Sequence, residues 1–209
     1  MSPLPLPTSP EPDFPGPPRF VSQTSVSLEG QPPNSTVLLT VLRNALAGGP
    51  YPPDAILRAI VDTARILTGA NGTAIALQTD GTVICCARSG DLAPELGSLL
   101  NVDSGISGQC FRTAQPLRCD DARTDSRVEP EVCRILGIRS IAAVPIHGSM
   151  GTFGILEAFS SHAHAFTNEH IRCLKDLSEI AEAAHRQEAA TKTLPPAQVG
   201  TALDRKSVV

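Results

Sequence analysis

Helical and strand-like patterns of apolar residues alternate through the middle of the chain. Apolar positions recur with helical spacing over 37–46 and 56–67, and Pro53 suits the first turn of the second helix. Two short apolar runs follow at 73–77 and 83–87, with a Thr-Asp-Gly segment between them. An Asp-Gly pair between strand-like runs favours a β-hairpin. This part of the chain is therefore predicted to form two helices and then a hairpin.

The next stretch predicts short elements and then two longer strands. A short helix is predicted over 105–113, a brief strand over 117–119, and another short helix over 130–137. Apolar runs at 140–146 and 152–159 predict two strands joined by a glycine-rich turn. The polar, turn-rich segments between these elements contain little that a core would bury.

A final helix is predicted to begin at Thr167 or Asn168, because either side chain is a good N-cap. Its apolar stripe consists of Ile171, Leu174, Leu177, Ala181 and Ala184. The whole series of elements predicts an α+β fold, in which helices pack on one face of an antiparallel sheet and irregular segments cover the other.

The predicted elements lie in one domain, 34–190, between two segments of different composition. Residues 1–33 hold ten of the 19 prolines, which favours a disordered tail, with a ligand for an SH3-type domain as the alternative. Residues 191–209 resemble a linker. The unusual final six residues, 204–209, lead us to expect that the natural chain continues.

Composition excludes several kinds of partner. The net charge is −4 with no cluster of Lys or Arg, and aromatic residues make up 3% of the chain, so no nucleic-acid partner is expected. No apolar run approaches the roughly 18 residues of a membrane span, and no signal pattern opens the chain, so we expect a cytoplasmic protein with no membrane partner. The six cysteines form no C-x-x-C pair, and we expect most to be small buried apolar residues.

Five motifs in order make the region 40–187 resemble the GAF domain family. A G-x-x-G stretch continues to a Thr-Ala-Gln-Pro turn, where Ala114 replaces the family's usual glycine. A D-x-x-x-D-x-R turn follows, and then three further matches. The matching segments are 105–117, 121–127, 133–146, 154–156 and 166–169.

The resemblance implies a GAF/PAS-like sheet, with a lid of loops and short helices over a pocket that binds a small molecule. The ligand and any cofactor are unknown. Strand alternation leaves open whether Cys85 or Cys86 faces that pocket. Asp121, Asp125 and Arg127 also suit a loop that only braces itself. The candidate ligand-binding residues are Cys86, Ile106, Cys110, Asp121, Cys133, Ser140 and Glu157.

The function implied by the resemblance is a regulatory, non-catalytic sensor domain that forms a homodimer through its first and last helices. One alternative is a free methionine sulfoxide reductase, using Cys110 and Cys133, although its W-x-G-F-Y strand is absent and Phe111 replaces a glycine of its motif. A ligand-free dimerisation unit is another alternative. Arg134 after Cys133 argues against bilin attachment, and the absence of an Asn-Lys pair argues against cyclic-nucleotide binding.

A metal site is the least favoured alternative. His162, His164 and His170 lie near one another in sequence, but their spacing is not that of a compact ligand set. We therefore predict no metal and assign no catalytic residue.

Overall fold

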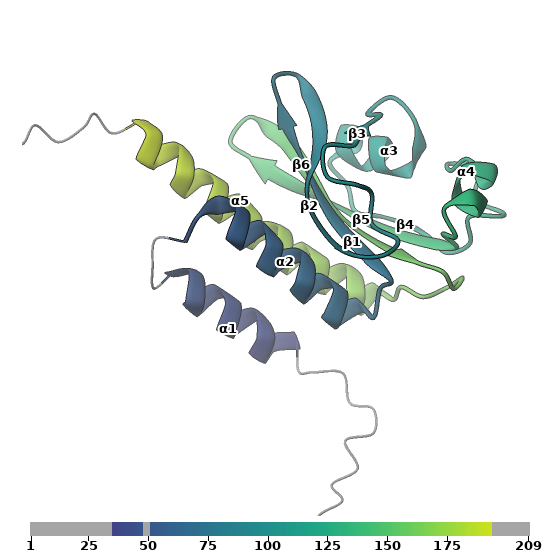
Figure 1. Cartoon of the computed structure of the whole chain (residues 1–209), viewed down its shortest axis with the longest axis horizontal. Helices are drawn as coiled ribbons and strands as arrows, with labels where there is room; N and C mark the ends of the chain where they lie inside the picture. The colour runs from purple at the N-terminus through teal and green to yellow at the C-terminus, as the bar shows by residue number, and fades with distance from the viewer. Residues whose placement is uncertain (1–34, 48–50, 194–209) are drawn as a thin grey trace, which may run out of the picture. The chain divides into compact units, whose positions relative to one another are not determined.

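The computed structural model describes residues 35–47 and 51–193 (Figure 1). The prediction for 1–33 lies outside the described residues, as does the prediction for 191–209 except at 191–193, and both stay predictions. The elements are α1 (Ser35–Ala47), α2 (Pro53–Thr68), β1 (Gly72–Thr79), β2 (Thr82–Gly90), β3 (Leu99–Leu100), α3 (Gly105–Thr113), β4 (Leu117–Cys119), α4 (Pro130–Ile135), β5 (Ser140–Gly148), β6 (Gly151–Ser160) and α5 (Asn168–Thr193).

The six strands form one antiparallel sheet in the order β3-β2-β1-β6-β5-β4. Helices α2 and α5 pack on one face, and α3 contacts β4, β5 and β6 on the other (Figure 1). The predicted α+β fold is confirmed. The two-residue strand β3 was not predicted, because a pair of leucines carries no alternating pattern.

The helix-covered face contains the larger core. Ile60 and Val61 of α2 and Leu174 and Leu177 of α5 are fully buried against apolar side chains such as Val144. Full burial of one such side chain contributes about 1.5–3 kcal/mol, so this layer supplies much of the stability of the domain.

Polar contacts mark where the elements start and join. The buried Thr73 hydroxyl donates to the Val61 carbonyl (2.7 Å) and ties β1 to α2. The Thr167 hydroxyl accepts the His170 backbone N–H, and His170 Nδ1 accepts the Thr167 N–H, both at 3.3 Å. This reciprocal cap makes Thr167 the N-cap of α5.

Helix α5 extends to Thr193, beyond the point where its apolar stripe ends. Its last turns contain several Ala and Glu residues, which are strong helix formers. Among the described helices, none is both long enough and apolar enough to cross a membrane.

Candidate functional site

The face of the sheet opposite α2 and α5 has small side chains at its centre. Ala74 and Ala76 of β1 pair with Glu157 and Ile155 of β6, and Ala143 of β5 pairs with Glu157 from the other side. Paired residues point to the same face of a sheet. Glu157 therefore lies between two alanines on the face that α3 covers.

Glycine allows α3 to pack closely on the segment that precedes it. A Cβ atom on Gly108 would lie 2.6 Å from the Asn101 carbonyl oxygen and 2.7 Å from that of Val102. Only glycine fits there without displacing backbone. The resulting position of α3 buries Ile106 and Cys110 against the sheet.

Glu157 is the only charged side chain among the described residues that is buried. It accepts a hydrogen bond from the Ser107 hydroxyl of α3. Burial raises the pKa of the Glu157 carboxyl to about 7, against a smaller lowering by the Ser107 hydrogen bond. A buried carboxylate normally needs a cation or several donors, and here the described residues supply one hydroxyl.

The cysteines near this carboxyl are free thiols. Burial, and then the charge of Glu157, raise the pKa of Cys110 to about 12. Burial is also the main cause that raises the pKa values of Cys85 and Cys133. All three are buried, and none has the thiolate character of a reactive cysteine.

Cys85, not Cys86, faces α3. A register shift between Ile75 and Ala76 places Ala76 opposite Cys85 and leaves Cys86 at a β-bulge. Cys86 is exposed, and its thiol contacts the Ile75 carbonyl oxygen (3.3 Å). The candidate Cys86 is therefore corrected, because Cys85 is the one of the two cysteines that faces α3, a choice that strand alternation left open.

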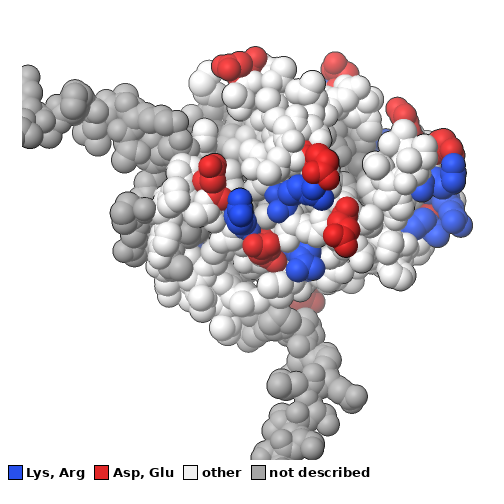
Figure 2. Space-filling model, in the orientation of Figure 1, with Lys and Arg blue, Asp and Glu red and all other residues white. Residues whose placement is uncertain are grey.

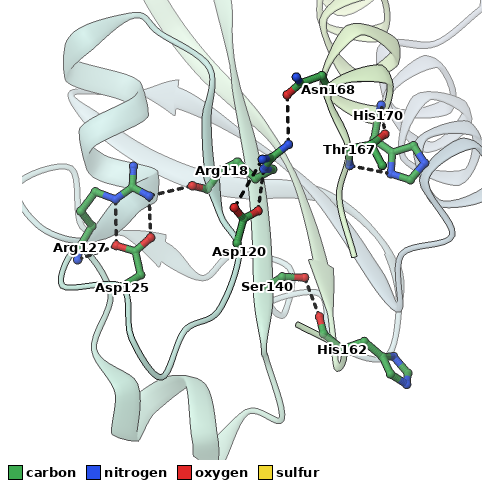
Figure 3. A network of polar contacts seen from close by, with 9 residues as sticks. All are labelled: Arg118, Asp120, Asp125, Arg127, Ser140, His162, Thr167, Asn168 and His170. Carbon is green, nitrogen blue, oxygen red and sulfur yellow. Dashed lines mark hydrogen bonds and ion pairs between the residues drawn. The ribbon is translucent and has the colours of Figure 1, made fainter. Parts of the chain in front are cut away.

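Ser140 also lies outside the Glu157 site. Its neighbour along β5, Ile141, faces the α3 side, so Ser140 points to the other face. The Ser140 hydroxyl donates to the His162 carbonyl (2.8 Å), which ties β5 to the segment after β6 (Figure 3). Its role is therefore to join elements, and the prediction that it lines the site is corrected.

Asp121 braces its loop. Its carboxylate accepts hydrogen bonds from Nε and Nη2 of Arg139, at 3.1 and 2.8 Å, and from the Arg123 backbone N–H at 3.1 Å. The hydrogen bond from Arg139 is the main cause that lowers the pKa of Asp121. Since its oxygens are already engaged, Asp121 does not belong to the Glu157 site.

Asp125 and Arg127 form a second, separate brace (Figure 3). Arg127 holds Asp125 with Nε at 2.9 Å and Nη2 at 2.5 Å, and Nη2 also donates to the Arg118 carbonyl at 2.7 Å. This pairing lowers the pKa of Asp125 to about 2. Arg127 thus binds Asp125, while Arg139 binds Asp121, and both pairs brace the loop.

The histidines of the metal alternative have other contacts. His170 Nδ1 accepts the Thr167 N–H at the start of α5, and the His162 backbone carbonyl binds Ser140 (Figure 3). No cluster of three or more His, Cys, Asp or Glu side chains suited to a metal occurs in 35–47 and 51–193.

Of the seven predicted residues, the structure brings Ile106, Cys110 and Glu157 together, and Cys133 packs in the adjoining apolar cluster with Ile106. Sequence reasoning missed Ser107 and left Cys85 undecided. Ser107 lies inside the recognised G-I-S-G stretch, but its partner is 50 residues away. The arrangement offers a buried hydrogen-bond acceptor beneath a short helix, with no activated nucleophile.

Solved structures of low sequence identity share this fold. The free methionine-R-sulfoxide reductase of Neisseria meningitidis, in complex with its substrate, matches with a TM-score of 0.65 and 16% identity over 75% of this chain and 91% of that one. The GAF domain of a phosphoenolpyruvate-protein phosphotransferase from Coxiella burnetii matches with a TM-score of 0.62 and 20% identity, over 76% and 97%. A protein described as a GAF sensor from Burkholderia vietnamiensis gives 0.63 and 15%, over 75% and 96%.

No curated protein matches this sequence. The family model for the GAF domain matches residues 51–184, which run from the segment before α2 into α5 and include every residue of the Glu157 site. The match covers more than half of the chain, and the structure has the sheet and helix layers that the sequence motifs implied. The chain therefore belongs to the GAF domain family.

Proposed function

We propose that this domain is a non-catalytic sensor in signal transduction, which binds a small molecule between α3 and the sheet. The proposal rests on one observation: the buried Glu157 carboxyl accepts a hydrogen bond from the Ser107 hydroxyl and from no other described side chain. In this account Ser107 takes the place of the ligand when the site is empty, and α3 moves outward when the ligand enters.

The chemistry of Glu157 indicates the kind of ligand. An ionised carboxylate is acceptor-only, so it selects a ligand with N–H or O–H donors, and best a cationic one. Ala74, Ala76 and Ala143 give the sheet a smooth apolar surface around the carboxyl. We therefore propose a small molecule with an apolar body and an amine or amide group.

A thermal-unfolding screen tests this proposal. The full chain is heated at pH 8 with a panel of amine- and amide-containing metabolites, beside Glu157→Gln and the surface control Glu179→Gln. A ligand at 100 times its Kd stabilises by about 2.7 kcal/mol. We expect at least one compound to raise the Tm of the wild type and of Glu179→Gln but not of Glu157→Gln. Equal shifts in all three proteins would contradict the assignment of the site.

The reductase alternative is favoured by one observation, the structural similarity to the Neisseria enzyme. We propose that this chain lacks that activity, because burial raises the pKa values of Cys110 and Cys133. The check is a free methionine sulfoxide assay with a thiol reductant. Turnover that disappears in Cys133→Ser would establish the reductase and refute the sensor proposal.

We also propose a cytoplasmic homodimer. All six cysteines are free thiols, which suits a reducing compartment. Helix α1 supplies the surface for a second copy, since Val37 and Val41 are 56% and 59% exposed. By contrast, Leu174, Leu177 and Ala181 of α5 are buried in the core, so the last helix has less apolar surface to offer.

A further inference from the structure

A cavity lies outside the Glu157 site, beside α4. It has a volume of about 520 Å³ and is lined by the loop after β4, by α4, by the segment 137–139 just before β5 and by the residue after β6. Three arginines line it: Arg123, Arg134 and Arg139. Lys and Arg side chains gather at the α4 end of the molecule, on the right in Figure 2.

Carboxylates orient two of these guanidinium groups, but each group keeps N–H donors that form no hydrogen bond within the described residues. Arg134 binds Glu131 through Nε (2.9 Å) and Nη2 (2.6 Å), and Arg139 binds Asp121 through the same two nitrogens. Within the described residues, Nη1 of either arginine donates no hydrogen bond. Because a guanidinium has five donors in a rigid plane, each pair fixes the plane and leaves two N–H donors on Nη1.

Arg123 is the third guanidinium. It is exposed, and in 51–193 its side chain forms no hydrogen bond or ion pair, although its backbone N–H binds Asp121. The three arginines carry three positive charges, and the carboxylates of Asp121 and Glu131 neutralise two of them. The rim of the cavity therefore has an excess positive charge.

The cavity also has an apolar part. Ala122 and Ile138 line it and are 1% and 6% exposed, and the ring of Pro130 adds apolar surface at the start of α4. Ligand sites commonly combine apolar walls with a few convergent polar groups. The apolar side suits a short carbon skeleton, and the arginines suit an oxyanion.

We propose that this cavity is an anion site, in which the oxygens of a small carboxylate or phosphate accept hydrogen bonds from Arg123 and from Nη1 of Arg134 and Arg139. The site is distinct from the Glu157 site, because Glu157 and Ser107 do not line it, although Ala122 and Ile138 pack in the same apolar cluster as Ile106. The domain would then have two ligand sites, one beneath α3 and one beside α4.

The test is an NMR titration of the uniformly ¹⁵N-labelled full chain with inorganic phosphate and, separately, with succinate, at constant ionic strength set by sodium chloride. We expect saturable shifts of the amides of Ala122, Arg123, Gly137 and Ser161. Binding of phosphate alone or succinate alone would assign the class of oxyanion.

Two variants make the titration decisive. Arg123→Ala removes the unpaired guanidinium and should weaken binding about tenfold, the effect of losing a charge-assisted hydrogen bond. Arg58→Ala removes an equally exposed charge from α2 and should leave binding unchanged. The proposal is overturned if neither anion gives saturable shifts at the cavity, or if Arg123→Ala binds as well as Arg58→Ala.

Discussion

Glu157 shows how one residue determines the chemistry of the face beneath α3. Neighbouring alanines provide no polar group, and Cys110, the nearest ionisable group on α3, stays a neutral thiol because burial raises its pKa to about 12. The Glu157 carboxyl is thus the polar anchor of the site, and its protonation links the stability of the domain to pH.

Glu157→Gln should stabilise the domain in a pH-dependent way. Burial raises the folded-state pKa to about 7 from an ordinary 4.5, so the folded state binds the proton more tightly than the unfolded state. Stability is therefore lost as pH rises from about 4.5 to about 7. The variant, which cannot ionise, should gain up to about 3 kcal/mol over the wild type at pH 8 and almost nothing at pH 4.

Urea unfolding at the two pH values measures this difference, with Glu179→Gln as the surface control. A gain of equal size at pH 4 and pH 8 would mean that Glu157 does not titrate in this window.

Ala114→Gly should also stabilise. Ala114 ends α3 in the left-handed region, at φ 55° and ψ 29°, where the family's usual residue is glycine. An L side chain there costs about 1–2 kcal/mol, offset in part by the extra freedom of glycine in the unfolded chain. We expect a net gain of about 0.5–1 kcal/mol in urea unfolding.

The matched control for Ala114→Gly is Ala183→Gly, at an exposed position inside α5, which should lose about 1 kcal/mol. Losses of equal size at both positions would contradict the left-handed conformation of Ala114.

At the scale of elements, periodicity predicted the helices and strands because each buries one face. It could not predict the contacts between them. Alternation could not decide between Cys85 and Cys86, because the bulge in β2 determines which of them faces α3. Ser140 was placed wrongly because it points to the opposite face of the sheet, where its hydroxyl donates to the His162 carbonyl. Ser107 was missed because residues 50 apart meet only in the folded sheet.

The exposed face of helix α1 is the proposed dimer interface. Leu39 is buried, whereas Val37 and Val41 are exposed on the opposite side of the helix. Val37→Asp with Val41→Asp should convert the dimer to a monomer in sedimentation velocity at micromolar concentration, because two charges would be buried without partners. The control Thr36→Asp adds a charge at another exposed position of α1 and should remain dimeric. A wild type that sediments as a monomer would contradict the homodimer.

At the scale of the whole molecule, the GAF match and the described core both begin after the proline-rich segment. Deletion of residues 1–33 should leave the Tm within about 2 °C, since ten prolines favour solvated backbone over a packed core. Calorimetry of the full and shortened chains makes this comparison. A fall of 5 °C or more would show that the segment contributes to the stability of the domain.

Native mass spectrometry of the full chain, purified from cells without denaturation, tests whether a small molecule binds at Glu157. We expect a folded wild-type protein that carries a non-covalent small molecule, and a folded Glu157→Gln protein that has lost it. The same bound mass on both proteins, or no bound mass on either, would contradict a ligand site at Glu157.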